Sequence, residues 1–580
     1  MISNLEQKVA LVSPNDPFQK IISQMSLGGK EIFGIVLVVD EIKKLQGVIS
    51  SGDILRSLAR GEVTDLTARD IMASNPISSS IHATDEQILQ AMRSQLLLRS
   101  GGKKNLTRYI PLLDDEGVVH DVADAFMLLS QSPKKGDRVQ VYGLGFVGLT
   151  LAVTLSARGH LVSAIDTNKQ VIDQLLEGQP HIFEPRLTDM LRRALTDKRL
   201  KFFTSPDDEH YRVVIISVGT PVNENGTADL TDLQLVCKIV GKRLQRGDLV
   251  MLRSTVPVGT TRSSIKVLLE SESNLKAGED FNLAFTPERT LQGQAMKELT
   301  SLPQIVGGLS NRCAEKAIVF WQTLTDSVVH VDSLEAAELV KLINNSFRDL
   351  SFAFANGVAL QADRFNLVAS KLIAAANDGY PRNPIPFPSP GVGGYCLTKD
   401  PLLYASTDSL SNHGQLSLKA REVNIEAGQY PLEIVKRFSK RLGLPLSDLR
   451  IVIAGMAFKG LPETNDLRGS SAISLSMILH REGCKVLNYD AIVDKEAIEA
   501  FGLEFVTKER LIYEVTICDV FLILNNHPSN LPEGLIAALG DKRILIFDAW
   551  SILDRQEIEQ FEHITYSTMG YMTPKRKSTK

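Results

Sequence analysis

The chain has 580 residues, 43% of them hydrophobic and 23% charged, so we expect a globular protein with three or four domains. Its net charge of −4 argues against a general nucleic-acid binder. We expect no signal peptide, because the first residues lack a basic segment followed by an apolar one, and no membrane span, because no apolar run reaches the ~18 residues needed. The five cysteines and ten histidines are scattered, which predicts free thiols in a reducing cytoplasm and no metal site.

An imperfect internal repeat occupies the first 132 residues. Residues 33–40 and 45–53 read as a strand, a turn and a second strand before a helix, and residues 110–115 and 117–121 repeat this pattern. Two such copies predict a pseudo-symmetric α+β module. The polar stretch 133–137 ends it.

Regular alternation of strands and helices begins after this break. Strands are predicted at 139–142, 161–165, 213–218 and 248–252, with a helix at 146–158, which indicates a parallel sheet. The segment Gly143-Leu-Gly145-Phe-Val-Gly148 joins the first strand to that helix, as in dinucleotide sites, where the glycines permit a tight turn, pyrophosphate approach and close helix packing. Asp166 ends the next strand, where a carboxylate can bind ribose hydroxyls and disfavour NADP. We therefore predict NAD binding, the alternative being a tight structural turn.

The next hundred residues, 331–430, read differently. Residues 335–363 predict a long helix on which Lys341 and Asn345, one turn apart, could donate to an oxyanion; the alternative is a surface lysine paired with Glu338. Cys396 follows a glycine-rich loop, where a thiolate could attack an aldehyde, although a lone cysteine is often a small core residue. Asp400 lies on the same face as Cys396 if a helix begins there.

Residues 431–580 predict a second α/β domain without the glycine fingerprint. Its strands are expected at 450–454, 485–489, 520–524 and 544–547, with a helix at 470–480. The fold class expected is therefore α/β, with two Rossmann-like doubly wound domains joined by a long central helix and preceded by the α+β module. Polar segments follow several strands, at the sheet edge where ligands bind, although each could be ordinary turn chemistry: 218–221, 254–260, 286–289, 458–459 and 466–471.

Taken in order, these motifs resemble the UDP-glucose/GDP-mannose dehydrogenase family over residues 138–570. The matching stretches are GLGFVG, VGTP, STVPVGT, TPER, ELVKLINNSF, GVGGYCLTKD and AFKG followed by DLRGSS. The resemblance implies an NAD domain at 133–330, a central dimer-forming segment with the cysteine loop at 331–430, and a UDP-sugar domain at 431–580. It also implies a homodimer or higher oligomer, four-electron oxidation of a sugar C6 alcohol with two NAD and one water, and a uronic acid product for polysaccharide synthesis.

The resemblance also assigns roles to individual residues. Cys396 would form the thiohemiacetal and thioester, Lys341 and Asn345 would hold the oxyanion, and Asp400 would orient water. Glu288 would assist thioester hydrolysis, with Thr255 near the nicotinamide or the water. The implied cofactor residues are Gly143, Gly145, Phe146, Val147, Gly148, Asp166, Thr220, Pro221, Thr255, Lys459 and Arg468. The implied substrate residues are Glu288, Arg289, Lys341, Asn345, Gly393, Phe458 and Lys459.

The sequence of the cysteine loop indicates which nucleotide sugar is the substrate. Tyr395 and Pro401 depart from the UDP-glucose pattern, which resembles GFGGSCFPKD, whereas the CxxxDP ending and DLRGS resemble the branch acting on UDP-N-acetylhexosamines. We therefore predict UDP-GlcNAc or UDP-ManNAc as the substrate. The alternatives are UDP-glucose, a two-electron dehydrogenase, and a non-catalytic NAD- and adenylate-binding sensor.

Residues 1–132 resemble a tandem CBS module, through the segments 47–56 and 70–76. In such modules a Ser or Thr and an Asp three residues later bind the ribose of an adenine nucleotide, and Ser50 and Asp53 fit this pattern. Asp121 replaces the hydroxyl residue in the second copy, with Asp124 following. The resemblance therefore implies one nucleotide site, or a module that serves assembly alone.

Overall fold

The computed structural model describes residues 5–26, 32, 34–50, 52–54, 57, 66–83, 87–88, 91, 109–124, 136–223, 226–325, 327–382, 384–408 and 410–574. The chain divides into two compact units, Met1–Gly136 and Asp137–Lys580. In the described ranges, no helix has both the length and the apolar character needed to cross a membrane.

The first unit contains two three-stranded sheets with the same topology. One consists of β1 (Ala10–Val12), β2 (Ile35–Val39) and β3 (Leu45–Ser50), and the other of β4 (Ser79–Ser80), β5 (Tyr109–Leu113) and β6 (Val119–Asp124). In each sheet the first two strands are parallel and the last two form an antiparallel hairpin. Val119 and Val122 pack with Ile35 and Leu37, so the two copies share a core.

The second unit begins with an eight-stranded sheet in the order β14-β13-β12-β11-β10-β7-β8-β9. Its strands are β7 (Arg138–Tyr142), β8 (Leu161–Ile165), β9 (Leu200–Phe203), β10 (Val213–Ile216), β11 (Leu249–Leu252), β12 (Asn282–Phe285), β13 (Gln304–Gly308) and β14 (Val328–Val331). Only the pair β12/β13 is antiparallel. The central strands are apolar and buried because helices cover both faces, among them α7 (Phe146–Ala157), α10 (Thr231–Gly241), α11 (Lys266–Ser273) and α13 (Asn311–Trp321). The strand order reverses at β7/β10, where such sheets bind ligands at their carboxyl edge.

A second, six-stranded sheet follows, in the order β16-β15-β17-β18-β19-β20. Its strands are β15 (Arg450–Ala454), β16 (Lys485–Tyr489), β17 (Val520–Ile523), β18 (Ile544–Asp548), β19 (Ile564–Thr568) and β20 (Tyr571–Met572), and α18 (Ser471–Arg481) follows β15 after a loop. Its order reverses at β15/β17. The predicted fold of two doubly wound domains is confirmed.

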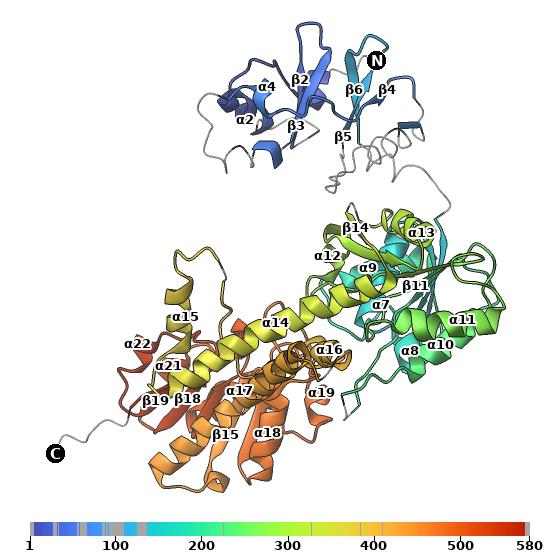
Figure 1. The fold of residues 1–580 in the computed structure, drawn as a ribbon. Helices are drawn as coiled ribbons and strands as arrows, with labels where there is room; N and C mark the ends of the chain where they lie inside the picture. Colours follow the sequence, from blue (N-terminus) through green and yellow to red (C-terminus); the bar gives the residue numbers. More distant parts are fainter. Residues whose placement is uncertain are drawn as a thin grey trace. The chain divides into compact units, whose positions relative to one another are not determined.

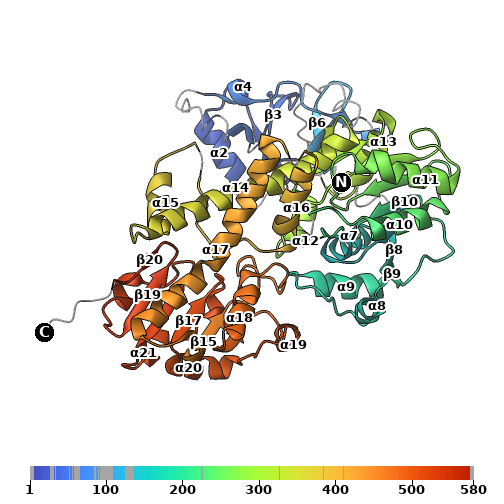
Figure 2. The ribbon, with the colours of Figure 1, turned by 60° about the horizontal axis from the view of Figure 1, so that its bottom comes forward.

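Two long helices, rather than the single one predicted, lie between the sheets and pack against each other (Figures 1 and 2). They are α14 (Leu334–Asp363) and α17 (Asn412–Leu442), and the chain between them forms α15 (Ala369–Asn377) and α16 (Tyr395–Ser406). The predicted boundary at Pro431 falls inside α17. A proline removes one helical hydrogen bond, but the buried face of α17 continues on both sides of it, from Ala427 to Val435, and packing keeps the helix whole.

Candidate active site

The glycine loop after β7 has the geometry of a pyrophosphate cradle. Gly143 has φ +84°, and a Cβ there would lie 2.8 Å from the carbonyl oxygen of Ser217. A Cβ on Gly148 would lie 1.8 Å from the carbonyl oxygen of Gly143, so the helix packs directly on the turn. At Gly145, by contrast, an added Cβ would meet no atom within 4 Å, which leaves the backbone open to a phosphate. The next two residues, Phe146 and Val147, are half-buried and begin α7.

Asp166 is held at the rim of this cradle. Its Oδ2 accepts the N–H of Leu144 at 2.8 Å, and its Oδ1 accepts the N–H of Asn168 at 2.9 Å. Each carboxylate oxygen can accept a further hydrogen bond. The fixed negative charge therefore suits ribose hydroxyls and disfavours a 2′-phosphate, so the residues present fit NAD.

Two neighbouring loops extend this edge of the sheet. Thr220, in the loop after β10, donates its hydroxyl to the carbonyl of Thr255, in the loop after β11, and Ser254 donates to the carbonyl of Val218 at 2.7 Å. Pro221 is exposed beside them. The two predicted cofactor segments are therefore tied together.

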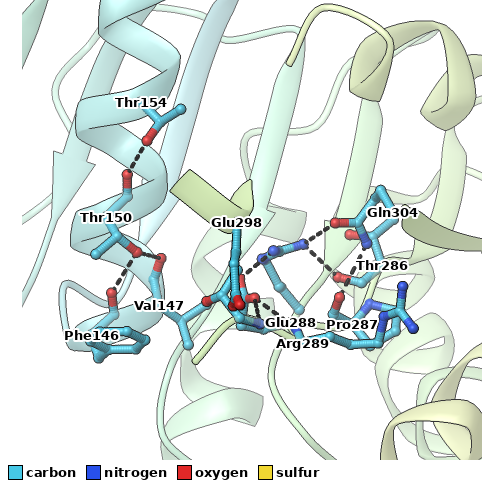
Figure 3. A network of polar contacts seen from close by, with 12 residues as sticks. Phe146, Val147, Thr150, Thr154, Thr286, Pro287, Glu288, Arg289, Glu298 and Gln304 are labelled. Atoms are coloured by element: carbon cyan, nitrogen blue, oxygen red, sulfur yellow. Dashed lines mark hydrogen bonds and ion pairs between the residues drawn. The ribbon is translucent and has the colours of Figure 1, made fainter. Parts of the chain in front are cut away.

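A buried ion pair joins the segments that follow β11 and β12, and Figure 3 shows one of its members, Glu288, within its network of polar contacts. Arg253 forms an ion pair with Glu288 and donates to the carbonyl of Thr286 and to Oε1 of Gln304, each at 3.0 Å. Its guanidinium also lies 4.6 Å from the centre of the Trp321 ring. Because these partners engage the guanidinium, Arg253 has a fixed position under the site.

Glu288 has both carboxylate oxygens engaged. Oε2 pairs with Arg253, while Oε1 accepts the N–H groups of Arg289 and Thr290, each at 2.6 Å. Burial alone would raise the pKa of this carboxyl, but Arg253, the N–H of Thr290 and the charge of Lys341 outweigh burial and lower it. Glu288 is therefore an ionised, oriented acceptor. The predicted substrate residue Arg289 donates to the carbonyl of Pro303.

One face of α14 carries a row of buried polar side chains at helical spacing, which begins with Glu338, Lys341 and Asn345. The surface pairing of Lys341 with Glu338 is not observed. Lys341 is only 7% exposed, and Glu338 instead accepts hydrogen bonds from Gly259 and Thr261. Lys341 is thus held inside the site, where its charge acts on other groups.

The glycine-rich loop before Cys396 packs closely on the C-terminal domain. A Cβ on Gly393 would lie 2.6 Å from the carbonyl oxygen of Gly469, and one on Gly394 would lie 2.8 Å from the Phe458 ring. Gly394 also has φ +85° and directly precedes α16. The loop therefore places Cys396 in the first turn of that helix, where it is solvent-accessible.

Cys396, Lys341, Asn345 and Asp400 form one cluster. Asp400 is fully buried and accepts from Nδ2 of Asn345 at 2.6 Å, and its other oxygen lies 3.0 Å from the Lys399 ammonium. Cys396 is exposed at the surface, but many protein groups lie near its thiol, so desolvation raises its pKa, as does the charge of Asp400, while Lys341 opposes the rise. The charge of Lys341 therefore favours the ionised form of both the cysteine and the carboxylate.

Lys459 and Arg468 lie on the C-terminal side of the same site. Lys459 donates to the carbonyl of Gln292 at 2.8 Å, across the seam between the two sheets, and desolvation lowers its pKa to about 8. Arg468 pairs with both oxygens of Asp466, at 2.9 and 2.7 Å, and its guanidinium lies 4.7 Å from the centre of the Tyr395 ring. Arg468 is thus placed beside the cysteine loop, and Lys459 at the contact between the two domains.

Sequence reasoning did not identify Arg253 or the contacts of Glu338. The signal for Arg253 was a charged residue directly after the apolar run 249–252, at the ligand-binding edge of the sheet. Glu338 was considered only as a partner of its neighbour on the helix.

The first unit has a smaller site at the end of β3. Ser50 donates its hydroxyl and its N–H to the same carboxylate oxygen of Asp53, at 2.6 and 2.8 Å. In the second copy, Asp121 instead forms an ion pair with Lys8 at 2.6 Å. The two copies therefore differ at the position where such modules bind a ribose.

Comparison with known proteins agrees with this geometry. Models of the UDP-glucose/GDP-mannose dehydrogenase family match residues 137–325 as the NAD binding domain, 335–426 as the central domain and 452–555 as the UDP binding domain, and a CBS domain model matches residues 2–60. The UDP-N-acetyl-D-mannosamine dehydrogenase of Campylobacter jejuni is 35% identical over 353 residues, 60% of this chain and 84% of the relative. The enzyme of that name from Pyrococcus horikoshii is 32% identical over 392 residues, 67% of this chain and 90% of the relative.

Solved structures give the same result. The UDP-D-ManNAc dehydrogenase of Pyrococcus horikoshii superposes with a TM-score of 0.67 at 29% identity and covers 75% of this chain and 99% of its own. A UDP-glucose dehydrogenase from Pyrobaculum islandicum does so with a TM-score of 0.65 at 25% identity, covering 76% and 99%. The predicted NAD-dependent oxidoreductase is thereby confirmed, as is a CBS domain over residues 2–60, and this chain belongs to the UDP-glucose/GDP-mannose dehydrogenase family.

Proposed function

We propose that the protein oxidises the C6 alcohol of a UDP-N-acetylhexosamine, UDP-ManNAc or UDP-GlcNAc, to the carboxylate through a thioester on Cys396. The observation that carries this proposal is the cluster in which an accessible cysteine lies beside the charge of Lys341 and the buried pair of Asn345 and Asp400. A two-electron oxidation needs no such nucleophile. The names of the relatives support the N-acetylhexosamine over glucose.

The reaction consists of two successive oxidations at C6, followed by hydrolysis. NAD, when bound, accepts one hydride from C6 in each of two oxidations. In the first, the C6 hydroxyl loses its proton to a water held by Asp400, which gives the aldehyde. The Cys396 thiol then gives up its proton to solvent, its sulfur adds to the aldehyde carbon, and the carbonyl electron pair moves to the oxygen. Lys341 and the second N–H of the Asn345 amide stabilise that oxyanion.

Hydride loss from this adduct leaves a thioester. Water attacks the thioester carbon, the C–S bond breaks, and the electron pair returns to sulfur, while the protons pass to solvent. The ionised Glu288, fixed by Arg253, orients the attacking water rather than acting as a strong base, since its pKa is lowered. Thr255 would lie near the nicotinamide or near this water.

The test is the number of NADH formed per sugar, with UDP-GlcNAc, UDP-ManNAc, UDP-GalNAc and UDP-glucose offered separately. Two NADH per UDP-N-acetylhexosamine, abolished in Cys396→Ala but retained in Cys484→Ala, is the expected result; Cys484 is a buried cysteine of the C-terminal domain. One NADH per sugar would contradict the thioester route. Preference for UDP-glucose would favour the alternative substrate, and no NADH with any sugar would favour a sensor.

We infer that the protein forms a homodimer through the central helices. Ile343, Phe347 and Phe354 lie on one face of α14 and are 46%, 68% and 61% exposed, and α17 adds the exposed Leu416 and Ile425. Apolar side chains gathered in this way mark an interaction surface. Phe347→Glu should shift the mass measured by light scattering to that of a monomer, whereas Phe501→Glu, at an exposed phenylalanine of the C-terminal domain, should not. A monomeric wild type would contradict the inference.

We infer further that the first CBS copy binds an adenine nucleotide. Ser50 fixes the Asp53 carboxylate at the end of β3, where it can accept hydrogen bonds from ribose hydroxyls. Calorimetry with AMP, ADP and ATP should show binding that Asp53→Asn abolishes and Asp121→Asn retains. Loss of binding in both variants, or in neither, would contradict a site in the first copy alone.

A further inference from the structure

Glu338 is a buried carboxylate whose contacts all lie far along the chain. It is 1% exposed and lies in the second turn of α14. Its Oε2 accepts the N–H of Gly259 at 2.5 Å, and its Oε1 accepts the N–H and the hydroxyl of Thr261 at 2.8 and 2.6 Å. A buried charge is costly unless it is hydrogen-bonded, and these three donors offset part of that cost, while burial still raises the pKa of the carboxyl.

The donors belong to the loop that carries Thr255. This loop follows β11 and ends at the one-turn π-helix η1 (Thr261–Ile265), which continues into α11. Its first part is fixed by Thr220, which donates to the carbonyl of Thr255. Glu338 fixes its second part, and the negative charge faces the N-terminal N–H groups of the η1–α11 helix, where anions are favoured.

The same face of α14 carries the oxyanion donors. Lys341 and Asn345 lie three and seven residues after Glu338, on the same buried face of the helix. One rigid helix therefore contacts the Thr255 loop through Glu338 and carries the two oxyanion donors further along. If the loop shifted relative to this helix, the position of Thr255 relative to Lys341 would change.

We propose that Glu338 is a positioning residue, which sets the loop of Thr255 in register with the oxyanion donors Lys341 and Asn345. This inference rests on the proposed function, because the position of the Thr255 loop relative to Lys341 and Asn345 affects the rate only if hydride leaves C6 beside those donors. Misplacement by about 1 Å can cost a reaction ~100-fold in rate, so the loss should appear in kcat.

The chain offers a matched control on the same two elements. Glu335, one turn earlier on α14, forms an ion pair with Arg262 of η1, but both side chains are partly exposed. Glu338→Gln replaces one acceptor oxygen by an NH2 group, which must face an N–H donor, whereas Glu335→Gln removes one charge of a partly exposed ion pair, whose contribution solvent screens. Thr261→Val is a milder change, because it removes one of the three donors to Glu338 and leaves the carboxylate in place.

The experiment measures kcat, the KM for UDP-sugar, the KM and calorimetric Kd for NAD, and the Tm. Glu338→Gln should lower kcat ~10-fold or more and weaken NAD binding, with the KM for UDP-sugar within ~2-fold of wild type. Thr261→Val should change the same quantities in the same direction by less, and add nothing in the Glu338→Gln background. Glu335→Gln should match wild type throughout.

A lowered Tm with unchanged kcat and NAD affinity in Glu338→Gln would show a structural role only and overturn the proposal. So would equal effects of Glu335→Gln and Glu338→Gln. If Glu338→Gln does not fold, unchanged kcat and NAD affinity in Thr261→Val refute the proposal. If wild type makes no NADH with any nucleotide sugar, the proposed function fails, and the NAD affinities of the variants still decide whether Glu338 holds the cofactor loop.

Discussion

Alanine at Gly145 and at Gly148 should separate cofactor binding from folding. The two positions lie in one turn, but a Cβ on Gly148 would lie 1.8 Å from the backbone oxygen of Gly143, well inside the 3.4 Å at which ordinary contact begins. A Cβ on Gly145 would meet no atom within 4 Å. Gly145 also has φ −64° and ψ −167°, extended backbone that alanine adopts without strain.

The expected magnitudes follow from these distances. The clash at Gly148 is with backbone, so no side-chain rotation relieves it, and Gly148→Ala should cost at least the ~1–3 kcal/mol of an overpacked core. At ~3 kcal/mol the Tm of a domain of this size falls by ~6–12 °C. Gly145→Ala should change the free energy of unfolding by less than ~1 kcal/mol, while its methyl group occupies the space of a pyrophosphate and weakens NAD binding ~10-fold or more, about 1.4 kcal/mol.

Thermal unfolding and NAD calorimetry on both variants make the assay. Gly145→Ala should unfold at the temperature of wild type and bind NAD weakly, and Gly148→Ala should unfold early. If Gly145→Ala bound NAD as wild type does, the loop would not hold the pyrophosphate. If Gly148→Ala were as stable as wild type, the close approach of α7 to the turn would be wrong.

Three further predictions concern the charges of the site. The rate at which iodoacetamide alkylates Cys396 should rise with pH to a midpoint above ~8.5, the pKa of a free thiol, because the pKa of Cys396 is raised. Lys341→Met should move the midpoint higher, and a midpoint at or below ~8.5 in wild type would contradict the desolvation. The KM for UDP-sugar should rise as pH rises through about 8, where Lys459 loses its charge, and should stay constant in Lys459→Arg. If KM depended on pH equally in wild type and in this variant, Lys459 would be excluded as a phosphate ligand. Arg253→Met should lower the free energy of unfolding by ~3–5 kcal/mol in urea by leaving the Glu288 charge buried and unpaired, and adding Glu288→Gln should recover part of the loss.

Local sequence patterns were sufficient for much of the fold. Apolar runs between turn residues predicted β8, β15 and β16 with the bounds that the structure has, because a strand buried on both faces needs only a short continuous apolar stretch. The role of the glycines in the NAD loop could also be predicted from sequence, since each glycine is required by the local geometry of a single turn. The predicted domain boundary at Pro431, in contrast, falls inside α17, whose packed face continues across the proline.

The partners of the site residues were decided by the tertiary structure alone. Sequence spacing placed Lys341 one turn from Glu338, and nothing local distinguished a surface pair from a buried lysine. Strand order brings the loop after β11 against α14, so that Glu338 meets Thr261, 77 residues away, and Arg253 meets Glu288, 35 residues away. Which donor reaches which carboxylate depends on how the sheet and the central helix pack, and that packing is the sum of contacts far apart in the chain. The sequence by itself therefore determined the elements and the chemistry they carry, and only the tertiary structure decided which charges are buried together.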